Sequence, residues 1–353
     1  MDVKLQWKSY GAAVLGMLWA LRLLAVPVQA APAVSAQCAV VYDTLSGEFL
    51  YEKAPDQRSL IASTTKIMTG YLVAELCDPD QLVTIPAEAC GIEGSSLYLK
   101  PGEKLTVRDL LYGLMLHSGN DAAVALALTA KGSEAAFVQA MNERAARLGL
   151  RSTHFANPHG LDDDGNYSTA RDLARLAAAA LENELFAQVV ATTTIQIPGR
   201  SLHNHNKLMW RYDGADGVKT GFTKAAGRIL VSSATRGGRR LVAVTLNAPD
   251  DWRDHAALLD AGFAGYQLCT VLRAGEPFAA LPLAQGAGAY AVIAPDREVQ
   301  VLLAPGERIT CRLLAPRFLY GPATTGQQAA EIRVCLHGKA VASCAGVVVR
   351  TEA

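Results

Sequence analysis

The chain has 353 residues, half of them hydrophobic, and its 33 basic side chains balance 33 acidic ones. No cluster of Lys and Arg interleaved with aromatic residues suggests a nucleic-acid footprint, so nucleic acid is excluded as a partner class. The length exceeds the usual size of one domain, so we expect two domains with a large buried core.

The N-terminus has the composition of a secretory signal peptide. Lys4 and Lys8 precede an apolar run at residues 11–20, and small residues follow, ending at Ala30 and again at Ala36. An arginine interrupts the apolar run before it reaches the roughly 20 residues of a membrane span. We therefore expect a signal peptide within residues 1–36, cleaved after Ala30 or Ala36, and an extracytoplasmic protein; retention as a membrane anchor is the alternative.

The next segments predict strands and then helices. Residues 39–42 and 48–51 are strand-like runs around a polar turn, which indicates a β-hairpin. After Ser63 the apolar residues recur at helical spacing, which places Ser63 at a helix N-terminus. Residues 105–180 hold long Ala- and Leu-rich helical segments.

Strands return in the second half of the chain. Residues 228–235 and 241–247, joined through a Gly-Gly turn, predict a second hairpin. Strands, helices and strands in this order indicate an α+β domain, which we place at residues 37–270. From residue 271 to 353, short apolar runs broken by Gly and Pro predict a small all-β domain.

Three motifs occur once each, and their ordered combination is far less expected by chance than any single member. Each alone would be an ordinary cap, turn or hairpin. They are Ser63-Thr64-Thr65-Lys66, Ser118-Gly119-Asn120 and Lys219-Thr220-Gly221.

The first motif has the spacing of a nucleophile and its base. A serine hydroxyl needs a nearby base, and a lysine amine serves only if its pKa is lowered. Residues three apart on a helix lie on nearly the same face, so the amine of Lys66 can reach the hydroxyl of Ser63. We predict Ser63 as the nucleophile and Lys66 as the base.

The other two motifs supply the remaining functions of such a site. Ser118 can relay a proton to a leaving amine, while the amide of Asn120 can bind substrate backbone. Lys219 adds a second cation, Thr220 can donate to a carboxylate, and Gly221 permits close approach of a substrate. This polarity fits a substrate with a free terminal carboxylate.

The sequence calls for no cofactor and no metal. None of the seven cysteines has C-x-x-C spacing, and the histidines near residues 203–206 lack a carboxylate at ligand spacing. Export permits disulfides such as Cys77 with Cys90 or Cys335 with Cys344, but buried thiols are an equal alternative.

With these motifs the chain resembles the serine D-alanyl-D-alanine carboxypeptidases among the low-molecular-mass penicillin-binding proteins, peptidase family S11. The resemblance is carried by residues 61–69, 116–123, 157–161 and 216–223, with Ala226-Gly227 following. It implies a penicillin-recognising, β-lactamase/transpeptidase-like domain with an antiparallel sheet covered by helices, followed by the family's β-rich second domain.

The resemblance also implies the activity and the partners. The substrate would be a peptidoglycan stem peptide ending in D-Ala-D-Ala, from which the terminal D-alanine is removed, and β-lactams would inhibit by acylating Ser63. Arg253 lies near the place where some members have a carboxylate-binding arginine. Two features depart from the family: Phe222 stands where some members have histidine, and no C-terminal amphipathic anchor is visible.

Three other functions compete with this interpretation. A class A β-lactamase would need a deacylating glutamate, but residues 153–164 contain none, so we expect slow hydrolysis of bound penicillin. A D,D-endopeptidase that cuts peptidoglycan crosslinks would use the same residues. A non-catalytic receptor for β-lactams or peptides would not need a nucleophile and a base together.

Overall fold

The computed structural model describes residues 19–20, 32–284, 289–303, 307–336 and 338–352. Contacts within the chain divide it into two units, one spanning Gln29–Ala264 and the other built mainly from Gly265 onward. Most of the predicted signal peptide lies outside the described residues. No helix in the part of the chain that the structure describes is long and apolar enough to cross a membrane.

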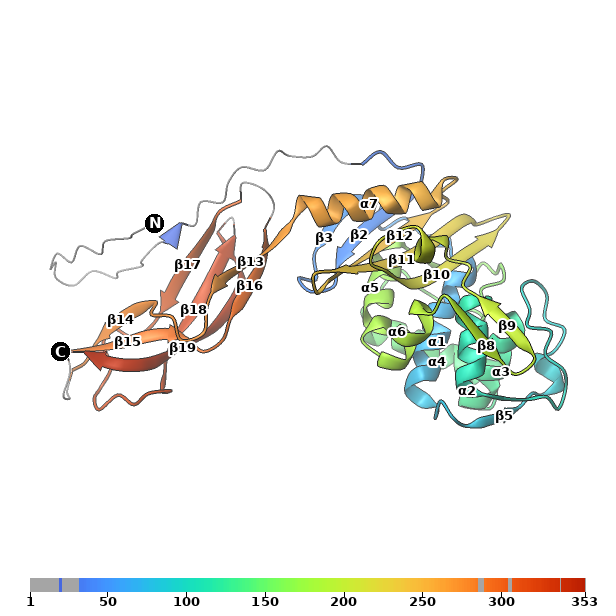
Figure 1. Ribbon diagram of the computed structural model, residues 1–353, viewed down its shortest axis with the longest axis horizontal. Helices are drawn as coiled ribbons and strands as arrows, with labels where there is room; N and C mark the ends of the chain where they lie inside the picture. Colours follow the sequence, from blue (N-terminus) through green and yellow to red (C-terminus); the bar gives the residue numbers. More distant parts are fainter. Residues whose placement is uncertain (1–18, 21–31, 285–288, 304–306, 337, 353) are drawn as a thin grey trace. The chain divides into compact units, whose positions relative to one another are not determined.

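A five-stranded antiparallel sheet forms the centre of the first unit (Figure 1). The predicted hairpins are confirmed: β2 pairs with β3, and β11 pairs with β12 across Gly237 and Gly238, whose positive φ angles suit a tight turn. The strand order places β10 at one end of the sheet. In spatial order the strands are β10 (Ala215–Thr223), β11 (Gly227–Arg236), β12 (Arg239–Leu246), β2 (Cys38–Asp43) and β3 (Phe49–Lys53).

Both faces of this sheet are covered by helices (Figure 1). Side chains alternate between the faces of a strand, so Val40 packs into the main helical core while Val41 packs against Leu258 and Leu259 of α7 (Asp251–Gly265). The helices opposite α7 are α1 (Lys66–Leu76), α2 (Val107–Leu116), α3 (Asn120–Lys131), α4 (Glu134–Arg147), α5 (Ala170–Leu181) and α6 (Glu184–Ala191).

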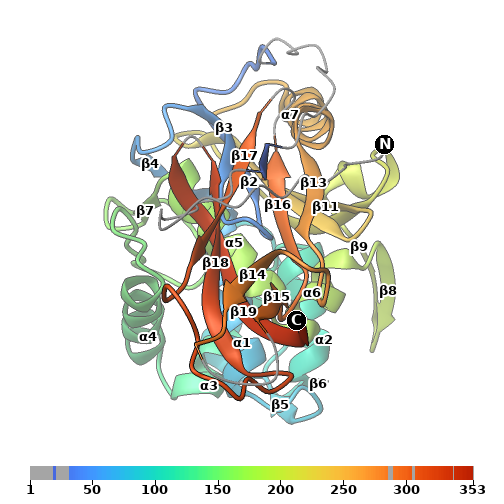
Figure 2. The same ribbon diagram turned by 90° about the vertical axis from the view of Figure 1, so that its left-hand side faces the viewer.

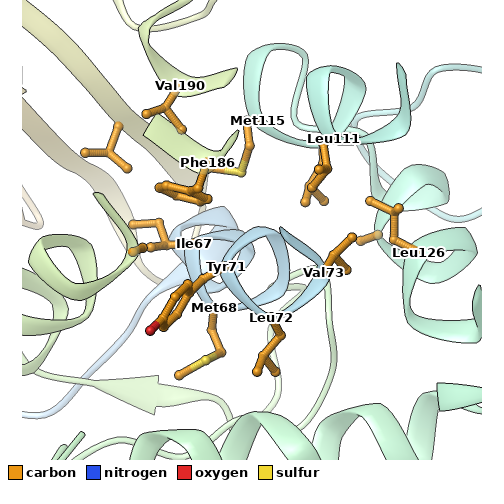
Figure 3. Packing of buried hydrophobic residues seen from close by; sticks show 14 of the residues in the cluster. Ile67, Met68, Tyr71, Leu72, Val73, Leu111, Met115, Leu126, Phe186 and Val190 are labelled. Atoms are coloured by element: carbon orange, nitrogen blue, oxygen red, sulfur yellow. The ribbon is translucent and has the colours of Figure 1, made fainter. Parts of the chain in front are cut away.

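Helix α1 is the centre of the main core. Figure 3 shows its Ile67 and Leu72 surrounded by side chains of the neighbouring helices, among them Met115 of α2, Leu126 of α3 and Phe186 of α6. Eight consecutive residues of α1, from Lys66 to Val73, are buried. This packing on all sides fixes the helix that carries Lys66.

Short elements connect these layers. The 3₁₀ turns are η1 (Ala62–Thr65), η2 (Ala87–Ala89) and η3 (Lys207–Trp210). The two-stranded ribbons pair β4 (Ser59–Leu60) with β7 (Tyr167–Ser168), β5 (Leu82–Thr84) with β6 (Lys104–Thr106), and β8 (Thr194–Ile197) with β9 (Arg200–His203).

The second unit is built of strands, several of which run side by side in Figure 2. Its main sheet has the order β1-β17-β18-β19-β15-β14, and β13 pairs with β16. The strands are β1 (Trp19–Ala20), β13 (Gln267–Leu272), β14 (Ala279–Pro282), β15 (Tyr290–Pro295), β16 (Val299–Leu303), β17 (Ile309–Leu314), β18 (Gln328–Leu336) and β19 (Lys339–Glu352).

All seven cysteines lie in the described part of the chain, and all are free thiols. Neither Cys77 with Cys90 nor Cys335 with Cys344 forms a disulfide. Cys335 and Cys344 are instead buried. Of the two alternatives that the sequence left open, the structure shows unpaired thiols.

A buried carboxylate anchors the segment just before β2. Asp254 of α7 accepts hydrogen bonds from the backbone N–H of Ser35 (2.9 Å), the hydroxyl of Ser35 (2.8 Å) and the backbone N–H of Ala36 (2.9 Å). Asp254 is only 3% exposed. Cleavage after Ala36 would remove all three donors, whereas cleavage after Ala30 would leave them in place.

We predict that a chain beginning at Gln37 is less stable than one beginning at Ala31. The buried carboxylate would lose three donors, and because water replaces them in part we expect a total loss of about 2–4 kcal/mol, which corresponds to a melting temperature lower by about 5–15 °C. Thermal unfolding of the two chains measures this. In an Asp254→Asn background the difference should shrink; an unchanged difference would show that Asp254 does not anchor the segment.

Candidate active site

Ser63 and Lys66 are in direct contact. Ser63 lies in η1, one 3₁₀ turn before Lys66 begins α1, so the predicted helix starts three residues later than expected. The Nζ atom of Lys66 is 2.9 Å from the Oγ atom of Ser63. The predicted spacing therefore brings the two groups within hydrogen-bond distance.

The amine of Lys66 is buried among acceptors rather than beside a carboxylate. It donates to the Oδ1 atom of Asn120 (2.7 Å) and to the backbone carbonyl of His159. Lys66 is 0% exposed, and this burial, together with the positive charge of Lys219, holds the pKa of its amine well below the usual value.

The three partners of Lys66 can be satisfied by either protonation state of its amine. A neutral amine has two N–H groups and one lone pair, whereas an ammonium has three donors and no acceptor. As an ammonium, Lys66 donates to Ser63, Asn120 and His159; once neutral, its two N–H groups keep Asn120 and His159, and its lone pair can accept from the hydroxyl of Ser63. In this state Ser63 donates its proton toward Lys66, which is the arrangement a general base requires.

Asn120 joins Lys66 to the loop at residues 93–99. Its Nδ2 atom donates to the carbonyl of Glu93 (2.5 Å), and its backbone N–H donates to the carbonyl of Ser95 (2.7 Å). Neighbouring Asp121 accepts from the backbone N–H of Leu97 (3.0 Å) and from other donors of the same loop. The second motif therefore orients Lys66 and fixes the loop beside it.

Ser118 ends the turn between α2 and α3 and is 5% exposed. Its φ of +64° is unusual for a residue with a side chain, and such backbone conformations often occur at functional sites. Gly119 follows, and a side chain there would collide with Asp121 and Leu97. The turn is thus held in one conformation by the loop that Asp121 anchors.

The third motif lies on β10, next to the turn that holds Ser63. Lys219 is 1% exposed, its Nζ atom donates to the carbonyl of Thr220 (2.9 Å), and burial lowers the pKa of its amine to about 7. A Cβ atom on Gly221 would lie 3.2 Å from the carbonyl oxygen of Ile61 and 3.3 Å from the backbone nitrogen of Ser63. Glycine lets β10 approach the nucleophile closely.

His159 was not singled out by the sequence analysis. The carbonyl of His159 accepts from Lys66, and Gly160 beside it has a φ of +88°, where a Cβ atom would lie 2.0 Å from the carbonyl oxygen of Ala62. Burial and the charge of Lys66 lower the pKa of the His159 ring to about 4. The only available signal was that residues 157–161 belong to the stretches that resemble the family.

Arg253 does not join this buried group of side chains. Its side chain is 85% exposed, and its nearest carboxylate is that of Asp250 at 4.0 Å. Another arginine lies on the strand that pairs with β10: Arg228 on β11 is in register with Phe222 and contacts Asp251. Among the described residues, no three His, Cys, Asp or Glu side chains are grouped to hold a metal ion.

Comparison with known proteins identifies the family. The sequence profile described as Peptidase S11, D-alanyl-D-alanine carboxypeptidase, matches residues 25–250. The chain belongs to the S11 peptidases.

Individual S11 relatives match both units of the chain. The D-alanyl-D-alanine carboxypeptidase DacA of Escherichia coli is 34% identical over 331 residues, which cover 88% of this chain and 82% of the relative. DacF of Bacillus subtilis is 34% identical over 285 residues, or 77% and 73% of the two chains.

Solved structures show the same fold. Penicillin binding protein 5 from Haemophilus influenzae has a TM-score of 0.74 at 31% identity and covers 91% of this chain and 98% of its own. The Streptomyces K15 DD-transpeptidase has a TM-score of 0.64 at 36% identity, covering 67% of this chain and all of its own. The S11 fold predicted from the sequence, a penicillin-recognising domain with an all-β C-terminal region, is confirmed.

We predict that acylation by penicillin has a bell-shaped pH dependence. On the acid side the rate falls as Lys66 takes up a proton, at a pH well below the usual lysine pKa because the amine is buried. On the basic side it falls as Lys219 loses its charge, from about pH 7 upward. The second-order rate constant of acylation, measured from pH 4 to 10, tests this.

Two substitutions separate the acid and basic sides of this pH profile. Lys66→Arg stays protonated and should slow acylation by about 100-fold or more at every pH. Lys219→Arg keeps its charge and should lose only the basic limb. A wild-type rate that climbs continuously to pH 10 would contradict the assignment of Lys66 as a base with a lowered pKa.

Proposed function

We propose that the chain is a serine D-alanyl-D-alanine carboxypeptidase that removes the terminal D-alanine from peptidoglycan stem peptides through an acyl-enzyme on Ser63. The observation that carries the proposal is the contact of 2.9 Å between Ser63 and a fully buried amine whose pKa is held well below its usual value. Membership of the S11 family supports the activity and the substrate class.

The first half-reaction forms the acyl-enzyme. The Oγ atom of Ser63 attacks the carbonyl carbon of the penultimate D-alanine and passes its proton to Lys66. Collapse of the tetrahedral intermediate breaks the C–N bond, and Ser118 relays a proton to the departing amine of D-alanine. Lys219, Thr220 and Gly221 bind the substrate beside Ser63 along β10.

The second half-reaction hydrolyses the ester. A water molecule attacks the acyl carbon, Lys66 again accepts a proton, and Ser63 leaves with a proton restored to its oxygen. Asn120 and His159 keep the amine of Lys66 in place through both halves. No cofactor is needed, because every proton transfer uses a group of the protein or water.

Penicillin should acylate Ser63 in the same way, but the ester that it forms should be hydrolysed slowly. The segment at residues 153–164 contains no glutamate that could activate a water molecule. The group of this segment that contacts Lys66 is the backbone carbonyl of His159, which cannot act as a base. A β-lactamase function is therefore disfavoured. A D,D-endopeptidase acting on crosslinks would use the same residues and is the second candidate.

Peptidoglycan lies outside the cytoplasm, and so should this enzyme. We propose export by a signal peptide with cleavage after Ala30, because cleavage after Ala36 would remove the donors that satisfy Asp254. Mass spectrometry of the exported protein would find Ala31 as its first residue.

We predict that Ser63→Ala abolishes both D-alanine release and covalent labelling by penicillin without changing the fold, because Ser63 supplies only the attacking oxygen. The test incubates the mature protein and the variant with a labelled penicillin and with a diacyl peptide ending in D-Ala-D-Ala. Peptide mapping locates the label, and released D-alanine is measured.

The carboxypeptidase proposal requires label on Ser63 and D-alanine released by the wild type alone. Label retained by Ser63→Ala would mean a different nucleophile. Label on Ser63 with no D-alanine, but with cleavage of crosslinked dimers, would favour the endopeptidase.

A further inference from the structure

An arginine outside the three motifs holds the loop at residues 93–99. Arg200 begins β9, directly after the two-residue turn Pro198-Gly199, where Gly199 has a φ of +72° that suits a tight turn. The ribbon of β8 and β9 packs into the main core through Leu202 and lies beside α2 (Figure 1). The turn and the core therefore fix the backbone of Arg200, and its side chain reaches the loop.

Every N–H group of the Arg200 guanidinium has an acceptor. An arginine side chain has five N–H donors. Two of them donate to the carboxylate of Glu103, at 2.5 and 3.0 Å, and two donate to the backbone carbonyls of Leu97 (2.8 Å) and Tyr98 (3.4 Å). The fifth donates to the carbonyl of Pro198 in the adjacent turn (3.3 Å). The side chains of Arg200 and Glu103 are 17% and 22% exposed, so water competes weakly for these bonds.

The carbonyls that Arg200 binds belong to a strained part of the loop. Tyr98 has a φ of +56°, which is unfavourable for a residue with a side chain. Its N–H donates to the hydroxyl of Ser96 (2.9 Å), and its carbonyl accepts from Arg200. Such a conformation persists only where the surrounding structure enforces it. Without Arg200 we therefore expect the loop to relax into other conformations.

The same loop is held from its other side by the residues that orient Lys66. Asn120 donates to two carbonyls of the loop, at 2.5 and 2.7 Å, while its Oδ1 atom accepts from Lys66 (2.7 Å). Neighbouring Asp121 accepts from three groups of the loop. The loop thus connects Arg200 with the start of α3. If the loop shifts, the amide of Asn120 is free to turn away from Lys66.

We propose that Arg200 is a positioning residue of the active site: by holding the loop at residues 93–99, it keeps Asn120 in the orientation that binds the amine of Lys66. The inference rests on the proposed function, because it takes Lys66 as the base of Ser63. All the donors of Arg200 are used on the loop, Glu103 and the adjacent turn, so Arg200 acts through these groups and not on the substrate.

The loss of Arg200 should raise the pKa of Lys66. Burial and the positive charge of Lys219 hold this pKa down, whereas the negative charge of Asp121 raises it. A loosened loop would admit water to the amine and would take hydrogen-bond donors away from Asp121, and both changes favour the ammonium form. The ring of His159 also acts on this amine, but its own pKa is about 4, so it stays neutral above that pH.

The test measures the second-order rate constant for acylation of Ser63 by penicillin from pH 4 to 10, with the mature protein and its variants. In Arg200→Ala the rate constant at pH 7 should fall by about 10–100-fold, because small misplacements of reacting groups have effects of this order. The acid side of the pH profile should move up by about 0.5–1 pH unit. A purely structural role would lower the melting temperature and leave the acid side in place.

Arg144 provides a matched control. It pairs with Glu75 near the C-terminal end of α1, and the two side chains are 23% and 26% exposed, close to the values for Arg200 and Glu103. Arg144→Ala removes an ion pair of similar burial that does not hold the loop. It should lower the melting temperature by a similar amount, change the rate constant by less than threefold and leave the pH profile in place. The same loss of rate in Arg144→Ala would overturn the proposal.

Arg200→Lys separates the ion pair from the bonds to the loop. A lysine keeps a positive charge for Glu103, but its three donors lie on one atom, so it cannot span Glu103 and the carbonyls of Leu97 and Tyr98 together. This variant should keep most of the thermal stability and still have a lower rate constant, with the acid side shifted in the same direction. A wild-type pH profile in Arg200→Lys or in Arg200→Ala would contradict the role of Arg200.

A second readout separates this inference from the proposed function. The titration of the Lys66 side chain, followed by NMR in the wild type and in Arg200→Ala, needs neither penicillin nor a peptide substrate. Lys66 should titrate higher in Arg200→Ala by about 0.5–1 pH unit. A wild type that released no D-alanine would contradict the proposed function, whereas a Lys66 that titrates at the same pH in both proteins would overturn the inference about Arg200.

Discussion

The site depends on a lysine amine that the fold removes from water. Charged ammonium groups are strongly hydrated, so complete burial favours the neutral form, and a second buried lysine nearby adds to this effect. The protein supplies Lys66 with two carbonyl-type acceptors and a hydroxyl, and no carboxylate contacts it directly. Burial without a carboxylate partner is what turns an ordinary cation into a base.

The rest of the catalytic unit holds three chain segments around this amine. Helix α1 is fixed by packing on all sides, the Asp121-bound loop fixes Asn120, and the His159 segment fits against η1 only because Gly160 lacks a side chain. Strand β10 closes the fourth side, with Gly221 against the backbone of Ser63. Packing of α1, the Asp121-bound loop and the close backbone approaches at Gly160 and Gly221 together set the positions of the reacting groups.

Local sequence patterns predicted the elements but not all the contacts between them. Both hairpins, the main helices and the contact of Lys66 with Ser63 follow from short-range spacing, because partners lie within a few residues or across a simple turn. The carbonyl of His159 comes from a loop 93 residues beyond Lys66. The place of Arg228 beside Phe222 likewise depends on strand register, which motif spacing alone does not give.

The most direct test of the account is the ionisation of Lys66 itself. The protein would be labelled with ¹³C and ¹⁵N in lysine, the Lys66 signals assigned with Lys66→Arg, and the side-chain shifts followed as the pH is raised from 5 to 11. We expect the amine to lose its proton well below the usual lysine pKa, because burial and Lys219 disfavour the charge. A Lys66 that stays protonated until about pH 10.4, as in an unperturbed peptide, would contradict its role as the base of Ser63.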